Sequence, residues 1–81
     1  MQIQINTKFN IGDTVYVADC TYDLYACKEP RKITNILVGG SLRHVKIQYE
    51  VSYDGNVETV PSGWAFATYD ECDQWCKEYN Q

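Results

Sequence analysis

One ten-residue segment places the strongest constraint on the fold. From His44 to Tyr53, apolar side chains occupy every second position and polar side chains lie between them. The apolar residues are Val45, Ile47, Tyr49, Val51 and Tyr53. Because successive side chains of a β-strand point to opposite faces, this pattern predicts a strand with one packed face and one face in water. Asp54 and Gly55 then favour a tight hairpin turn into another strand over Val57 to Val60, which ends at Pro61.

Two further strands are expected upstream of this hairpin. The segment from Thr14 to Ala18 alternates, is rich in β-branched and aromatic residues, and follows a Gly-Asp pair typical of turns. A second segment runs from about Arg31 to Val38, where the uneven spacing of Ile33 and Ile36 indicates a β-bulge. Between the two strands, the residues from Asp19 to Pro30 show no clear period, which predicts a long loop, with a short strand from Tyr25 to Lys28 as the alternative.

A single helix is predicted over about residues 69–79. Thr68 and Glu71 are spaced as a capping box, in which the threonine hydroxyl accepts a hydrogen bond from the third helical amide. Apolar residues then recur at helical spacing and form one stripe, which we expect to pack onto the sheet. The stripe consists of Cys72, Trp75, Cys76 and Tyr79.

The chain of 81 residues is long enough for one domain and too short for two. Four or five short strands cannot make two full sheets, whereas a small barrel removes exposed strand edges with little chain. The predicted fold is therefore mainly β (α+β), a small barrel of 4–5 antiparallel strands with a C-terminal helix, in a single domain over residues 1–81. No apolar run is long enough to span a bilayer and no signal-peptide pattern is visible, so we expect a cytoplasmic protein that has no membrane partner.

Four cysteines raise the alternatives of a metal site and of disulfide bonds. Cys72 and Cys76 are one helical turn apart, a spacing that suits metal ligation better than a disulfide. A zinc site needs two more ligands, and Cys20 and Cys27 are further apart than in the usual zinc motifs. Disulfides normally accompany a secretory signal. We therefore expect four reduced thiols, no metal and no cofactor, while the state of Cys20 and Cys27 stays open.

Two segments resemble a known group of proteins. The pattern Phe9-x-Ile11-Gly12-Asp13-x-Val15-Tyr16-Val17 resembles the first strand of SH3-like barrels. The segment from Trp64 to Cys72 resembles the ending of small uncharacterised bacterial and phage proteins that combine such a barrel with a C-terminal helix. The resemblance implies an SH3-like barrel and a phage, prophage or mobile-element setting, without a shared activity. Alanine usually occupies the positions of Cys72 and Cys76 in that pattern, which supports a packing role for both thiols.

The long loop is the first candidate surface for a partner protein. In SH3-like barrels that bind peptides, this loop presents aromatic and acidic residues, and the matching residues here are Tyr22, Asp23 and Tyr25. These three residues are candidates for an aromatic platform that binds a peptide or a methylated side chain, and Tyr16 and Trp64 are candidates to extend it. The alternative is that Trp64 and one or two of the tyrosines close the core.

The C-terminal acidic face is the second candidate surface. Residues 50–81 carry seven acidic residues and a single lysine, and the helix contributes Asp70, Asp73 and Glu78 to them. Such a face can steer a basic partner surface into contact. The alternative is a solvated face that keeps a small protein soluble.

Nucleic-acid binding and catalysis are the competing classes of function. Four bases on neighbouring predicted strands could contact phosphates, namely Arg31, Lys32, Arg43 and Lys46. The net charge of -4 disfavours that alternative. The single histidine, His44, has no serine or cysteine at a spacing that indicates a catalytic dyad, so no catalytic residue is expected.

These observations together predict a non-enzymatic protein-interaction module of phage or mobile-element type. The expected partner is a host or phage protein, and inhibition of a host defence protein is compatible with the acidic segment. The alternative is an accessory nucleic-acid-binding small barrel. The oligomeric state and the choice between the loop and the helix face stay open.

Overall fold

The computed structural model describes residues 7–41 and 43–81 and contains six strands and one α-helix. The elements in chain order are β1 (Thr14–Cys20), β2 (Leu24–Ala26), β3 (Arg31–Gly40), β4 (Val45–Tyr53), β5 (Asn56–Pro61), a 3₁₀ turn η1 (Ser62–Trp64), β6 (Ala65–Phe66) and α1 (Tyr69–Tyr79). The long alternating strand, its hairpin and the C-terminal helix are confirmed. The expected count of four or five strands is wrong, because β6 has only two residues and shows no alternation. The predicted long loop contains the short strand β2, which begins one residue before the expected Tyr25–Lys28 alternative and ends at Ala26.

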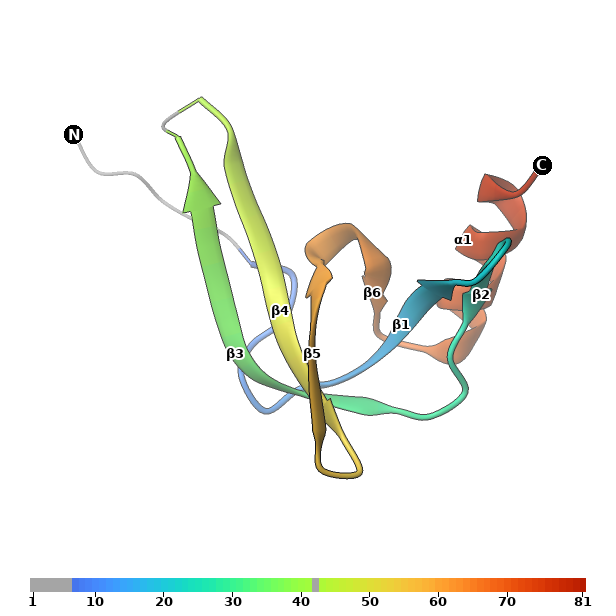
Figure 1. Ribbon diagram of the computed structural model, residues 1–81, viewed down its shortest axis with the longest axis horizontal. Helices are drawn as coiled ribbons and strands as arrows, with labels where there is room; N and C mark the ends of the chain where they lie inside the picture. Colours follow the sequence, from blue (N-terminus) through green and yellow to red (C-terminus); the bar gives the residue numbers. More distant parts are fainter. Residues whose placement is uncertain (1–6, 42) are drawn as a thin grey trace.

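The strands form an antiparallel sheet in the order β2-β1-β3-β4-β5, and β6 pairs with β1 outside this path (Figure 1). Asp54 and Gly55 both have positive φ, as the predicted hairpin turn requires. The register of β3 against β4 shifts between Ile33 and Asn35, which confirms the bulge. The sheet does not close on itself in the described part of the chain, because β5 pairs with β4 alone and the chain then turns through η1 towards β6.

Strand β1 lies between two cores and is buried on both faces. Val15 and Val17 point into the sheet core, whose buried residues are Phe9, Val15, Val17, Cys27, Ile33, Tyr49, Val51, Val60 and Ala65. Ala18 points into the helix core, whose buried residues are Ala18, Leu24, Ala26, Phe66, Cys72 and Cys76, and Tyr16 packs against it. The period-two alternation of a strand sends neighbouring side chains to opposite faces. The two cores are therefore coupled through one strand.

Tyr49 is the largest of the fully buried residues and joins the N-terminal segment to the sheet. Its ring meets the ring of Phe9 edge-on, with centroids 5.9 Å apart. Its hydroxyl oxygen accepts hydrogen bonds from the backbone amides of Lys8 and Phe9, at 3.1 and 3.2 Å. A buried tyrosine needs such a partner for its polar tip, and here the partner is the chain that enters β1.

The helix begins and docks largely as predicted. The Thr68 hydroxyl accepts a hydrogen bond from the amide of Glu71 at 3.2 Å, and Cys72 and Cys76 are buried against the sheet. Tyr79 differs from the prediction, because its side chain is 67% exposed near the end of the helix. No helix in the described residues has the length and apolar character needed to cross a membrane.

The residue after the helix covers one edge of the sheet. The side-chain amide of Asn80 donates to the carbonyl of Leu24 at 2.8 Å and accepts from its backbone amide at 3.2 Å. Leu24 belongs to β2, the first strand in the sheet order. The asparagine side chain therefore takes the place of a neighbouring strand, which reduces the exposure of unpaired backbone groups.

We expect Tyr49→Phe to lower the free energy of unfolding by about 1–3 kcal/mol, because it leaves two backbone amides without their acceptor. Urea denaturation followed by tryptophan fluorescence measures this change. Tyr22→Phe is the matched control, since the Tyr22 side chain is 95% exposed and its hydroxyl lies in water. Equal stability of the two variants would contradict the assigned role of the Tyr49 hydroxyl.

Candidate functional site

A surface pocket of about 370 Å³ lies where β2 leads into β3. Its polar lining comes from Asp19, Tyr25, Lys28, Glu29 and Arg31, and Ala26 and Cys27 complete it. Strands β1 and β2 form a two-stranded antiparallel ribbon, here called the β1–β2 ribbon. This ribbon builds one side of the pocket, and Arg31, the first residue of β3, builds the other. It therefore adjoins the loop that the sequence singles out.

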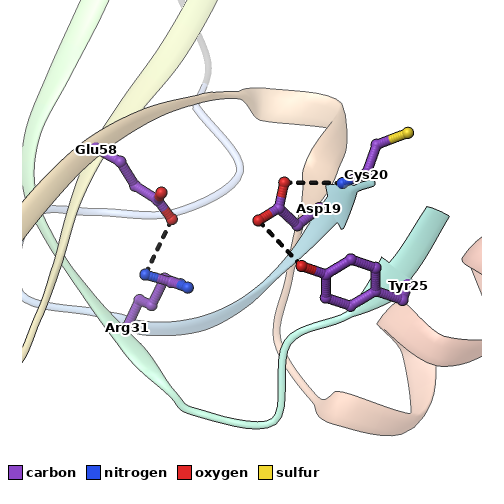
Figure 2. A network of polar contacts seen from close by, with 5 residues as sticks. All are labelled: Asp19, Cys20, Tyr25, Arg31 and Glu58. Atoms are coloured by element: carbon purple, nitrogen blue, oxygen red, sulfur yellow. Dashed lines mark hydrogen bonds and ion pairs between the residues drawn. The ribbon is translucent and has the colours of Figure 1, made fainter. Parts of the chain in front are cut away.

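Asp19 holds Tyr25 in place at one side of the pocket. The two residues are directly opposite each other in the β1–β2 ladder. One Asp19 carboxylate oxygen accepts from the Tyr25 hydroxyl at 3.4 Å, and the other accepts from the amide of Cys20 at 2.8 Å (Figure 2). Tyr25 is 46% exposed, so part of its oriented aromatic ring is open at the surface.

Arg31 forms the opposite side of the pocket. One of its guanidinium nitrogens, Nη1, is 2.9 Å from a carboxylate oxygen of Glu58 (Figure 2). The guanidinium carbon lies 5.6 Å from the ring centre of Tyr53. The side chain is only 14% exposed, and its buried Nε has no hydrogen-bond partner among the described residues. Buried donors are nearly always paired, so this buried Nε is an exception within a residue that lines the pocket.

The loop residues predicted to bind a partner lie close together in the chain and are exposed. Tyr22 and Asp23 occupy the turn between β1 and β2, and Tyr25 lies on β2. Leu24 and Ala26 face the helix core, so Tyr25 between them points to the opposite face of β2. The exposed set is therefore Tyr22, Asp23 and Tyr25.

The wider aromatic platform is wrong. Tyr16 and Trp64 pack against the helix core instead, where the ring of Tyr16 lies 6.3 Å from that of Tyr69 and the ring of Trp64 lies 6.2 Å from that of Trp75. The cause is the alternation of β1 and β2, which sends Tyr16 to the helix face and Tyr25 to the other face. The core alternative for Trp64 is the correct one.

The acidic helix face is partly engaged within the helix itself. Asp73 forms an ion pair with Lys77 at 2.9 Å, and Glu78 accepts a hydrogen bond from Gln74 at 3.1 Å. Asp70 is exposed in the first turn, where a negative charge is favoured by the helix dipole. These contacts support a solvated helix face more than a continuous acidic surface.

The four predicted phosphate-binding bases do not gather into one patch. Arg31 is paired with Glu58, whereas Lys32 is exposed on the opposite face of β3. Lys32 lies across from Ser52, six positions along β4 from Lys46, which is about 20 Å at the rise of a strand. Arg43 lies in the turn beyond β3.

The four cysteines are all unpaired, and they divide by exposure. Cys20 is exposed, whereas Cys27, Cys72 and Cys76 are buried. Burial raises the pKa of the Cys72 thiol to about 12, and burial also raises the pKa of Cys76. In the described residues no three or more histidine, cysteine or acidic side chains are grouped so that they could hold a metal ion. The helix thiols thus act as small apolar packing groups.

Comparison with protein-family models, with curated proteins and with solved structures finds no significant match to this chain. The residues themselves therefore carry the functional argument. The pairing of Arg31 with Glu58 and of Asp19 with Tyr25 was not visible in the sequence, because each pair joins residues from different strands.

We expect one cysteine per chain to react rapidly with a thiol reagent at pH 8, because only Cys20 is exposed and the nucleophile is the thiolate. Three more thiols should react after denaturation. Absorbance of released thionitrobenzoate measures both numbers, and Cys20→Ser should remove the rapid phase alone. Rapid reaction of two or more thiols in the folded protein would contradict the burial of the other three.

We also expect the free energy of unfolding to fall as the pH rises above about 9, the ordinary thiol pKa. The unfolded chain then loses the Cys72 proton while the folded chain keeps it, so the unfolded state binds fewer protons and stability decreases. Chemical denaturation between pH 8 and pH 10.5 measures the slope. Cys72→Ala should flatten it, and an unchanged slope in that variant would assign the effect to other groups.

Proposed function

We propose that this chain is a non-enzymatic protein-interaction module that contacts its partner through the exposed face of the β1–β2 ribbon and the adjoining pocket. The observation that carries the proposal is the pocket between Tyr25 and Arg31. The lining combines the ring of Tyr25, which Asp19 orients, with the side chain of Arg31. Aromatic and arginine side chains are the residue types enriched where binding energy concentrates.

The arrangement of strands supports an open SH3-like barrel as the scaffold of this site. Strands β3, β4 and β5 form a meander, a 3₁₀ turn follows, and β6 returns to pair with β1. The ribbon with β2 then takes the place of the long first loop. In such a scaffold one face of the β1–β2 ribbon packs on the helix core, and the opposite face, which carries Tyr25, is the one we propose for the partner.

The setting proposed for the module is a phage, prophage or other mobile element, acting on a host or phage protein in the cytoplasm. Inhibition of a host defence protein is the role we consider first. The nucleic-acid-binding alternative has less support, because Lys32 and Lys46 lie far apart on the sheet and Arg31 is paired with an acid. Phosphate binding requires clustered bases.

We expect the tagged protein to retain a partner protein from bacterial lysate at high salt, and Tyr25→Ala to weaken that binding about tenfold or more. Tyr79→Ala is the matched control, because Tyr79 is an exposed tyrosine on the helix. Bound protein and nucleic acid are both quantified at low and high salt. Partner binding that survives Tyr25→Ala would contradict the proposed surface, and retention of nucleic acid alone, released by salt, would favour the alternative function.

A further inference from the structure

Strand β4 extends beyond the end of its neighbour β5. The ladder between them ends where Gln48 pairs with Pro61, while β4 begins at Val45 and stays paired with β3 as far as Gly40. Figure 1 shows this β3–β4 arm projecting past β5. Over Val45–Ile47, the edge of β4 that faces away from β3 has no strand partner among the described residues.

Strand β5 ends earlier than β4 because of the residues that follow it. Strand β5 ends at Pro61, and the next residues form the 3₁₀ turn that carries the chain to β6. A notch results in line with β5. It is a pocket of about 380 Å³ lined by Val45, Lys46, Ile47, Gln48, Pro61 and Ser62.

The backbone of Val45 is directed towards this notch. Ser41 and His44 exchange both of their backbone hydrogen bonds, at 3.0 and 3.1 Å, so His44 faces β3. In an antiparallel ladder the following residue points its N–H and C=O the other way. The Val45 side chain is 44% exposed, so an extended segment there would gain both backbone hydrogen bonds and an apolar contact.

The positive charge of the β3–β4 arm favours a particular kind of partner segment. Between Glu29 and Glu50 the chain has no acidic residue, although the protein as a whole carries a net charge of -4. Lys46 is exposed and lines the notch, and Arg43 is exposed in the turn two residues before Val45. Their positive potential favours a negatively charged partner segment.

We propose that the open edge of β4 at Val45–Ile47 binds an extended acidic peptide segment of a partner protein by strand addition. The segment pairs with the backbone of Val45, places an apolar side chain in the notch beside Pro61, and sets its acidic residues near Lys46 and Arg43. An open strand edge beside a notch lined partly by Val45, Ile47 and Pro61 can hydrogen-bond a peptide backbone, which a phosphate backbone cannot match. This surface is separate from the one that contains Tyr25.

The test uses a random-peptide display library as the probe and the folded full-length chain as the target. Enriched peptides are synthesised, and their affinities are measured by fluorescence anisotropy for the wild type, Lys46→Glu and Lys32→Glu. Lys32→Glu is the matched control, because it makes the same charge change on an exposed lysine of the same sheet, about 20 Å away. Val45→Pro removes the outward N–H without removing a β3–β4 hydrogen bond, and circular dichroism checks that it folds.

We expect enriched peptides to be acidic, to lose about five- to tenfold in affinity with Lys46→Glu, and to be unaffected by Lys32→Glu. Folded Val45→Pro should lose binding, and Tyr25→Ala should retain it, which separates this proposal from the loop surface. Enrichment of no acidic peptide, equal effects of the two lysine variants, or full binding by folded Val45→Pro would overturn the proposal. A duplex oligonucleotide that displaces the peptides from the wild type, and whose own binding is lost in Lys46→Glu, would also overturn the proposal in favour of nucleic-acid binding.

Discussion

The two-sided burial of β1 is the constraint on which the rest of the structure depends. Val15 and Val17 are almost fully buried in the sheet core, and Ala18 is buried in the helix core. A small domain gains most of its stability from apolar burial. Because β1 lies between the two cores, its alternate side chains contribute buried apolar area to both. The pairing of β6 with β1 follows the same logic, because its two residues are divided between the two cores.

The two edges of the sheet differ in how their backbone groups are covered. At β2 the Asn80 side chain occupies the backbone groups of Leu24, so the helix end protects that edge. At the other side, Pro61 ends β5 before β4 ends, and the β4 edge stays open over a short length. Short open edges resist aggregation between copies while they still allow one segment to dock.

The proposed surface around Tyr25 consists of a few exposed groups held by buried structure. Tyr25 is oriented by Asp19 across the β1–β2 ladder, and Arg31 is oriented by Glu58 and by the ring of Tyr53. The helix core lies beneath the β1–β2 ribbon, whereas over Val45–Ile47 only Ile47 packs partly against the sheet core. A preordered surface loses less conformational entropy on binding, which favours affinity.

The sequence by itself determined the elements whose causes are local. The alternation from Val45 to Tyr53, the positive φ at Asp54 and Gly55, and the Thr68 cap depend on neighbouring residues, and all three were predictable. Only the tertiary structure decided that Tyr16 and Trp64 turn to the helix core, that β6 exists, and that Arg31 meets Glu58 beside the pocket. These features depend on which strands become neighbours, and that choice comes from burying two cores at once rather than from any local pattern.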